Sequence, residues 1–477
     1  MSEINYLYNK QNQSRNSGKE KMINFLPENI EFFEERDLSN KEEIQFKKIL
    51  FIKIILTSAI IYVLFYSFYD YFFVEKKNIR VAFYNYCIRY GGIERVTSIL
   101  LKYFSKEENF TFILVTQTGI LEGEFNIPTI IKRISLLEQK TDIFKVIRKE
   151  HIDILINNCD NPSEIVKLNK LRSTKVIHCT HSSFFYRIYY GSYNIEETVY
   201  QTYKTCKYLL ALIPLENDYL YKKWGINSLV MENPLTFDYN SVTPSELSQK
   251  NIIMIGRGDF AGKRFDLGIT SMKYIIPEIP ESKMYIVSAA YKNLNESVHD
   301  LNLESNVIIT GFQTDPSPYL KNSSLHIFPS VSEAYPMALG EVKIFGIPSI
   351  LCGLDYVILA EGGCINIYDD DPKTIAKEAI KILKDDEYRK KLGKEARESM
   401  KKLRNEIIIK KWKKLLVSIY NGLDELSFSR LFMGYNRNLT EQEAKTILNH
   451  QLNLLKKRIP RFKNLTLEKL EEFHLTR

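Results

Sequence analysis

Short apolar runs alternate with amphipathic stretches along most of the chain, and this alternation constrains the fold more than any other feature of the sequence. The runs have the length of buried strands and lie at residues 79–84, 110–116, 152–157, 175–179, 208–213, 228–231, 252–255, 283–288, 306–310 and 324–328. Apolar residues at helical spacing fill several of the intervals between them. Strands that alternate with helices in this way form a mostly parallel sheet, so the pattern predicts an α/β protein.

The alternation breaks once, around Asn233, and resumes after a polar stretch. A chain of 477 residues is too long for a single ordinary core and suits two domains with further segments at the ends. We therefore predict two Rossmann-like domains, residues 76–235 and residues 236–404, which meet at this break. An amphipathic stretch at residues 405–421 predicts one more helix, and residues 422–477 predict a small helical appendage.

The N-terminal segment departs from this pattern. Residues 1–48 are polar and lack an apolar period, which predicts a flexible tail. Residues 54–74 carry no charge except Asp70, and a helix of that length spans a hydrocarbon core of about 30 Å at about 1.5 Å per residue. Lysines flank the run on both sides, and tyrosines crowd its C-terminal half, as at membrane interfaces. We expect a single-pass membrane helix at residues 49–75 with the domains on the cytosolic side; a buried or interfacial helix is the alternative.

Composition and charge argue against several classes of function. The net charge is +8, but lysines and arginines are scattered among acids and no basic stretch carries interleaved aromatic residues, so nucleic-acid binding is not indicated. The six cysteines show neither a CxxC pair nor metal-ligand spacing, which argues against a zinc site and a disulfide framework. The DxD at Asp369–Asp371 directly precedes Pro372 and a helical run, as in helix capping. We therefore expect neither a metal nor a cofactor.

Two features of the first domain are candidates for ligand binding. Gly91 and Gly92 stand between the first strand-like run and a helical stretch, where backbone N–H groups and a helix N-terminus can bind an anion. A tight turn that needs glycine for its geometry is the alternative. His181 follows the run at residues 175–179, and loops at the carboxyl ends of parallel strands line the ligand crevice. Its imidazole can bind a sugar hydroxyl or a phosphate, or can be purely structural, as we expect of His178.

The second domain carries two cations and two carboxylates of interest. Arg257 and Lys263 lie in a glycine-containing loop after the run at residues 252–255. There they can bind a diphosphate and stabilise the charge that builds on a leaving phosphate without a metal ion; a solvated charged loop is the alternative. Glu333 lies in the loop after a strand, and Glu341 lies in the helix that follows. A purely structural interpretation makes Glu333 a loop residue and Glu341 an exposed helix residue.

This pair of carboxylates, followed by the turn Gly346-Ile347-Pro348, resembles the Glu-x7-Glu signature of retaining GT-B glycosyltransferases, the family called glycosyl transferases group 1. The correspondence covers residues 79–420, in the order of a GGxERV-like turn (Gly91, Gly92, Glu94, Arg95, Val96), the His181 loop, the Asn233 turn, the loop of Arg257 and Lys263, the two glutamates and the GIP turn. Ala334 and Pro336 stand where the family commonly has glycine, which leaves the identity of the sugar open.

By this resemblance the fold is GT-B, in which two Rossmann-like domains face each other across a cleft and residues 405–421 cross back onto the first domain. The resemblance implies that Glu333 contacts hydroxyls of the donor sugar and that Glu341 holds the ribose hydroxyls. It assigns the diphosphate to Arg257 and Lys263. Catalysis would then rest on Glu333 and His181, and donor binding on Gly91, Gly92, Arg257, Lys263 and Glu341.

The predicted function is metal-independent transfer of a hexose-type sugar, with retention of configuration, from a nucleotide diphosphate sugar to a glycan or lipid-linked acceptor. A UDP- or GDP-sugar is the expected donor, and the membrane helix favours polysaccharide biosynthesis at a membrane. Two alternatives stay open. One is a non-catalytic, membrane-bound sensor or scaffold that binds sugar nucleotides, and the other is a different GT-B enzyme, such as a nucleotide-sugar epimerase.

Overall fold

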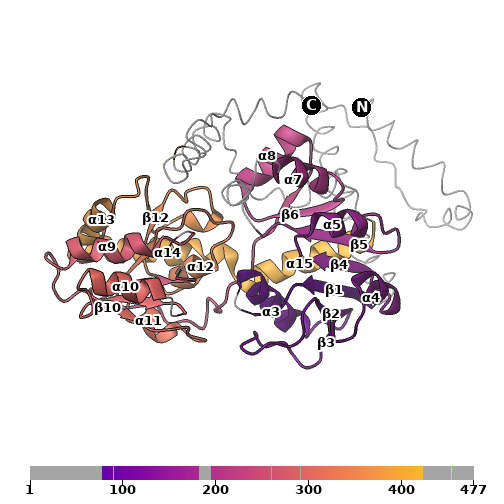
Figure 1. Cartoon of the computed structure of the whole chain (residues 1–477), viewed down its shortest axis with the longest axis horizontal. Coiled ribbons are helices and arrows are strands. Elements are labelled where there is room, and N and C mark those ends of the chain that lie inside the picture. Colours follow the sequence, from indigo (N-terminus) through magenta and orange to yellow (C-terminus); the bar gives the residue numbers. More distant parts are fainter. Residues whose placement is uncertain are drawn as a thin grey trace, which may run out of the picture. The chain divides into compact units, whose positions relative to one another are not determined.

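Every strand of the described chain belongs to one of two parallel sheets (Figure 1). The computed structural model describes residues 78–89, 91–181, 195–258, 262–289 and 292–422, together with Phe260 and Asn453. The expected tail, the expected membrane helix and, apart from Gly422 and Asn453, the expected appendage lie outside these residues. None of the described helices is both long and apolar enough to cross a bilayer.

The first sheet has the strand order β3-β2-β1-β4-β5-β6-β7, and its neighbouring strands are parallel. Its strands are β1 (Ile79–Asn85), β2 (Phe110–Thr116), β3 (Lys132–Ser135), β4 (Ile154–Asn157), β5 (Lys175–Cys179), β6 (Tyr208–Ala211) and β7 (Leu229–Val230). The helices of this part are α3 (Gly92–Phe104), α4 (Ile143–Lys149), α5 (Pro162–Leu168), α7 (Ile195–Tyr203) and α8 (Pro214–Trp224). The strand β3 was not predicted, because its sequence KRIS begins with two charged residues and contains no apolar run.

The second sheet has the order β10-β9-β8-β11-β12-β13 and is also parallel. Its strands are β8 (Ile252–Ile255), β9 (Met284–Val287), β10 (Val307–Ile309), β11 (Leu325–Phe328), β12 (Ser349–Cys352) and β13 (Cys364–Ile367). The accompanying helices are α9 (Phe265–Ile275), α10 (Lys292–Asp300), α11 (Ser317–Lys321), α12 (Met337–Ile344), α13 (Pro372–Lys384) and α14 (Asp386–Ser399). Together the two sheets form an α/β fold of the GT-B-like type.

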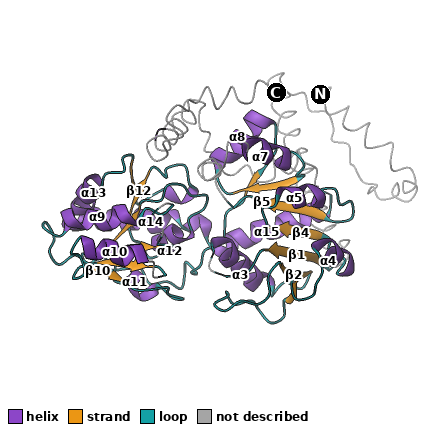
Figure 2. Ribbon diagram, viewed as in Figure 1, coloured by secondary structure: helices purple, strands orange, loops and turns teal. Residues whose placement is uncertain are grey.

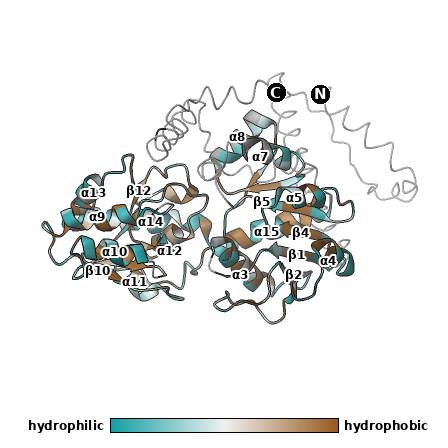
Figure 3. Cartoon of the chain, viewed as in Figure 1, coloured by the Kyte–Doolittle hydropathy of each residue, from teal (hydrophilic) through white to brown (hydrophobic). Residues whose placement is uncertain are grey.

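The strand β1 shows why continuous apolar runs form these sheets. Val81 and Phe83 lie in one core with residues of α3, whereas Ala82 and Tyr84 lie in a second core with residues of α4. Side chains of a strand point alternately to its two faces, so a strand that is covered on both faces must be apolar at every position. Figure 2 shows helices on both sides of each sheet, and Figure 3 shows mainly apolar strands between them.

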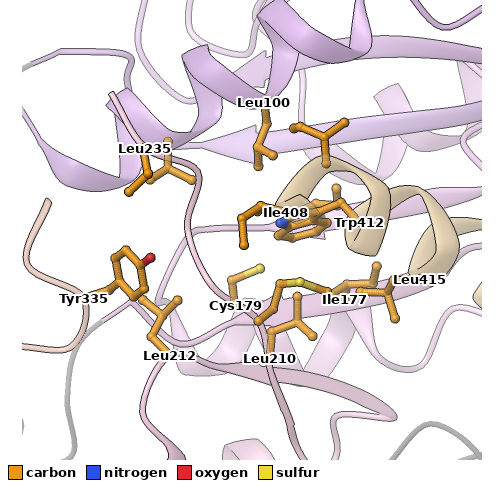
Figure 4. Packing of buried hydrophobic residues seen from close by; sticks show 14 of the residues in the cluster. Leu100, Ile177, Cys179, Leu210, Leu212, Leu235, Tyr335, Ile408, Trp412 and Leu415 are labelled. Atoms are coloured by element: carbon orange, nitrogen blue, oxygen red, sulfur yellow. The ribbon is translucent and has the colours of Figure 1, made fainter. Parts of the chain in front are cut away.

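The helix α15 (Asn405–Tyr420) packs on the first sheet, although it follows the second sheet in the sequence. Trp412 and Leu415 share a core with Leu210 of β6 (Figure 4). The side chain of Asn405 accepts the backbone N–H of Leu235 at 2.6 Å and donates to the carbonyl of the same residue at 3.0 Å. The amide thus joins the start of α15 to the end of the first domain.

The polar segment between the sheets is held by arginines of α14. Arg397 donates to the carbonyls of Tyr239 and Val242, both at 3.0 Å, and its guanidinium carbon lies 4.5 Å from the centroid of the Tyr239 ring. The buried Arg389 donates to the carbonyl of Leu247 at 3.0 Å. Because a guanidinium is a rigid, planar group with several donors, these contacts define the path of a segment that lacks regular secondary structure.

Candidate functional site

The strand order changes direction next to the first strand of each sheet, and the candidate residues follow strands at these two places. In the first sheet β2 and β4 flank β1, and in the second sheet β9 and β11 flank β8. Ligands of α/β sheets bind at the carboxyl ends of the strands beside such a switch point. Gly91 and Gly92 follow β1, Arg257 and Lys263 follow β8, and Glu333 follows β11.

The structure brings the carboxylate of Glu333 to the ammonium group of Lys263, and the two form an ion pair. Ser330 donates its hydroxyl hydrogen to the same carboxylate oxygen at 2.7 Å. The backbone N–H of Glu333 donates to the hydroxyl oxygen of Tyr356 at 3.0 Å. These contacts hold Glu333 at the end of β11 and turn its carboxylate towards the β8 loop.

The β8 loop itself depends on glycine. Gly256 directly follows β8 and has a φ of 146°, a backbone conformation that residues with a Cβ rarely adopt. The next residue, Arg257, has an exposed side chain. Further along the loop, the carbonyl of Gly262 accepts the backbone N–H of Val331 at 2.8 Å, which ties the β8 loop to the β11 loop. The two predicted cations therefore lie on the β8 loop, whose path is set by the conformation of Gly256 and by the hydrogen bond to the β11 loop.

Glu341 is buried, with a side chain that is 2% exposed, and it forms an ion pair with Arg95 of α3. Thr236 donates its hydroxyl hydrogen to the same carboxylate oxygen at 2.7 Å. The interpretation of Glu341 as an exposed helix residue is therefore wrong. The sequence pattern missed the burial because α12 is short and apolar around most of its circumference, so it has no clear solvent side.

The first turn of α3 carries charges that face the second domain. Arg95 pairs with Glu341, and Glu94 is close enough to Arg257 to feel its charge. Burial raises the pKa of the Glu94 carboxyl above its ordinary value, and the positive charge of Arg257 offsets part of this rise. Neither residue of the pair Gly91 and Gly92, which begins this turn, has a positive φ, so the geometry of a tight turn does not account for the two glycines.

His181 belongs to a polar network that sequence reasoning missed. Its Nε2 lies 2.8 Å from Oδ1 of Asn158. The amide nitrogen of Asn158 donates to Oδ1 of Asn85 at 3.1 Å and to the hydroxyl of Thr97 at 3.3 Å. Asn85 in turn donates to the same hydroxyl at 3.0 Å. Residues of β1, α3 and the end of β4 thus fix the position of the imidazole. The sequence signal for this network was the pair Asn85 and Asn158, because each asparagine ends or follows an otherwise apolar strand.

His178 is the structural histidine that the sequence predicts. It is buried within β5, and its Nδ1 lies 3.2 Å from the amide nitrogen of Asn157 on the neighbouring strand. Its ring centroid lies 5.8 Å from that of Tyr203. These contacts direct the side chain into the core instead of towards the loops after the strands.

The DxD sequence caps a helix. Asp371 is the N-cap of α13, and its carboxylate accepts the backbone N–H of Lys373 at 2.9 Å, with Pro372 in the first turn. Asp369 accepts the hydroxyl hydrogen of Thr374 at 3.0 Å, and Asp370 lies 3.3 Å from a guanidinium nitrogen of Arg264. All three carboxylates therefore have partners in the helix or in the β8 loop.

Two parallel α/β sheets, a charged loop after β8 and a helix, α15, that follows the second sheet and packs on the first together define the class of this protein. Residues 238–399 match the family model described as Glycosyl transferases group 1. The matched segment covers about a third of this chain and is similar to a glycosyl transferases group 1 domain. Arg257, Lys263, Glu333 and Glu341 all lie within it.

One curated relative and two solved structures place this domain and the fold among known proteins. An uncharacterized glycosyltransferase of Methanocaldococcus jannaschii is 28% identical over 183 residues, which are 31% of this chain and 45% of the relative, so the match spans less than half of that protein. Sucrose-phosphate synthase from Thermosynechococcus elongatus has a TM-score of 0.61 at 14% identity and covers 72% of this chain and 100% of its own. Anabaena HepE in complex with UDP and glucose has a TM-score of 0.59 at 14% identity, with the same two coverages. Likeness at such identities shows the GT-B-like fold alone.

Proposed function

We propose that this chain is a glycosyltransferase that moves a hexose-type sugar from a nucleotide diphosphate sugar to a glycan or lipid-linked acceptor, with retention of configuration and without a metal ion. One observation carries the proposal. The carboxylates of Glu333 and Glu341 each face a cation, Lys263 and Arg95 respectively, around the switch point of the second sheet. A nucleotide diphosphate sugar needs this combination, because its hydroxyls donate to carboxylates and its phosphates accept from cations.

The diphosphate is assigned to the β8 loop. Arg257 is exposed at this loop, and Lys263 lies further along it. When the bond between the sugar and the diphosphate breaks, negative charge builds on the leaving oxygen, and fixed cations lower the energy of that state. In the free protein Lys263 is paired with Glu333, so the arriving phosphate shares a cation that the protein has already positioned.

The sugar is assigned to Glu333 and His181. A carboxylate accepts hydrogen bonds from sugar hydroxyls, and an imidazole that Asn158 holds in place can contact the ring from the first domain. Transfer passes through an oxocarbenium-like state in which the bond to the diphosphate breaks while the acceptor oxygen bonds to the same face of the sugar. The departing phosphate takes the proton of the acceptor hydroxyl, so no further base is required.

The acceptor side is inferred from the sequence of residues 54–74. We propose that this run anchors the protein to a membrane and that the acceptor is lipid-linked or part of a surface polysaccharide. Deletion of residues 1–75 should release the protein from the membrane fraction, as measured by flotation. A truncated protein that still floats with vesicles would contradict the anchor.

The first test is turnover of UDP-, GDP- and ADP-sugars by the full-length protein with lipid and oligosaccharide acceptors. We expect nucleotide release with one donor, and in Glu341→Gln we expect the affinity for the nucleotide to fall by about 10-fold or more, as for the loss of a hydrogen bond to a charged group. Glu278→Gln is the matched control, since Glu278 forms an exposed ion pair with Lys384 in the same domain.

Other outcomes select the alternatives. Nucleotide-sugar binding without turnover under any acceptor would support the sensor, and formation of an epimer without an acceptor would support the epimerase. The absence of all binding would overturn the assignment of the site.

A further inference from the structure

A pocket lies beside His181, between the first sheet, α3 and α15. Its walls come from apolar side chains of β1, β4, β6 and α3, such as Phe83, Ile156 and Leu210. Figure 4 shows Trp412 of α15 among Leu100, Cys179, Leu210 and Leu212, all of which line the pocket. The remaining lining residues include the polar side chains of Thr97, Asn158, Thr180, His181 and Asn233.

Two polar groups at this pocket are buried without a hydrogen-bond partner in the described chain, the hydroxyl of Thr180 and the indole N–H of Trp412. Thr180 is 1% exposed and Trp412 is 4% exposed. Buried polar groups in folded proteins are almost always hydrogen-bonded. Thr97, Asn158 and His181 meet this rule through their own network. The two remaining groups therefore have donors available for a ligand.

The chemistry of the lining restricts that ligand. An indole N–H can only donate, so the ligand must present an acceptor, and a carbonyl oxygen has two lone pairs that can serve both donors. No lysine, arginine or carboxylate is among the described residues of the lining, so a phosphate or carboxylate would lose its hydration without gaining a counter-charge. Several sugar hydroxyls would likewise lose water against the apolar walls, whereas a methyl group is favoured there.

We propose that this pocket binds the acetamido group of an N-acetylated amino sugar. The methyl group packs against Leu210 and Leu212, and the carbonyl oxygen accepts hydrogen bonds from Trp412 Nε1 and Thr180 Oγ1. The inference rests on the proposed function, because it names the substrate class of that site. A nucleotide-linked amino sugar and an amino sugar of the acceptor share this chemistry, and the test separates them.

The test measures binding to the full-length protein by saturation-transfer NMR and titration. The probes are methyl N-acetylglucosaminide and methyl glucoside, each in the presence of UDP, and UDP-N-acetylglucosamine and UDP-glucose. We expect the acetyl methyl protons to receive the strongest saturation and the N-acetylated probe to bind more tightly than its glucose counterpart. A preference that appears only in the nucleotide-linked pair identifies the donor, and one that appears in the glycoside pair identifies the acceptor.

Thr180→Val replaces the hydroxyl by a methyl group of similar shape. We expect it to weaken binding of the N-acetylated probe by about 5-fold or more while leaving the glucose probe unchanged, because one hydrogen bond to the carbonyl is lost. Thr180→Ser keeps the hydroxyl and should bind like the wild type. Without ligand, Thr180→Val should raise the midpoint of thermal unfolding, because the unpaired hydroxyl is removed from the core.

Three results would overturn the inference: equal binding of N-acetylated and glucose probes, unchanged binding by Thr180→Val, or a lower unfolding midpoint for that variant, which would mean that the hydroxyl already has a partner in the free protein. The proposed function fails separately. Selective binding of the acetamido probe without any transfer would contradict only the transferase, whereas transfer without preference for the acetamido group would contradict only this inference.

Discussion

At the scale of single residues, Glu333 and Glu341 both face a cation, but their surroundings differ. Glu333 lies in a loop beside Lys263, whereas Glu341 is buried in α12 and its charge is balanced by Arg95, whose side chain is 20% exposed. A buried carboxylate that loses its cation keeps the cost of desolvation without the compensating attraction. Arg95 is therefore required for the stability of the free protein as well as for the position of Glu341.

This asymmetry predicts the outcome of a double-mutant cycle. Arg95→Met should lower the free energy of unfolding by about 2 kcal/mol. This value lies between the cost of breaking an exposed ion pair and the cost of breaking a fully buried one. Combining it with Glu341→Gln should restore part of the loss, because the unpaired charge is removed. Urea denaturation of the two single variants and the double variant measures the coupling. Strictly additive losses would show that the two side chains do not interact.

Glu94 predicts a dependence of stability on pH. Because burial raises the pKa of Glu94 in the folded state above the ordinary value of 4.5, the folded protein holds this proton more tightly than the unfolded chain does. The free energy of unfolding therefore falls as the pH rises through the window that begins at the ordinary value. Glu94→Gln removes this effect.

We therefore expect Glu94→Gln to be more stable than the wild type at neutral pH and to lose that advantage towards pH 4. Urea denaturation at several pH values measures it, with Glu107→Gln on the loop after α3 as the control. A stability difference between Glu94→Gln and the wild type that does not change with pH would contradict the raised pKa.

At the scale of elements, the loops after β8 and β11 and the start of α13 form one connected unit. Arg264 at the end of the β8 loop lies 3.3 Å from Asp370, and Asp371 caps α13. Gly262 and Val331 join the β8 and β11 loops through their backbones. The carboxylates before α13 thus stabilise local structure.

This unit predicts how the protein responds to loss of the cap and to a chelator. Asp371→Ala should cost about 1 kcal/mol of stability, the usual value for an N-cap, while a chelator should leave turnover of the wild type unchanged. Turnover with and without EDTA and denaturation of Asp371→Ala measure the two effects. Activity that EDTA abolishes and a divalent cation restores would contradict the metal-independent mechanism.

At the scale of the whole described chain, α15 connects the residues that follow the second sheet to the first sheet. Asn405 bonds to both backbone groups of Leu235, and its amide also lies 3.2 Å from the hydroxyl of Tyr103 on α3. Trp412 then fills the core beneath α3. The first domain is therefore complete only when the chain has passed through the second domain and returned.

The contacts of Asn405 at the start of α15 predict the effect of Asn405→Ala. The substitution leaves the buried N–H and carbonyl of Leu235 without their partner, which should cost about 2 kcal/mol. The fluorescence of Trp412 should report the loss, because this side chain lies in the same core. Asn421→Ala, just beyond the helix, serves as the control. Equal stability of the two variants would show that the Asn405 contacts do not hold α15 in place.

The sequence by itself determined the two α/β domains, since the alternation of apolar runs and amphipathic stretches is a local property that each segment carries independently of the rest. It also placed Arg257, Lys263 and Glu333 on loops after strands, because in a parallel sheet those loops share one edge. It missed β3, whose charged residues resemble a turn more than a strand, and β13, whose four residues CINI include a polar asparagine.

Only the tertiary structure decided which side chains meet. Arg95 and Glu341 are 246 positions apart in the chain, and neither residue type nor spacing indicates that they form an ion pair. The same holds for the network that Asn85, Thr97 and Asn158 build around His181. Periodicity is repeated many times along a sequence, whereas a contact between two distant residues depends on how whole elements pack, so the pattern could predict the domains but not the partners within the site.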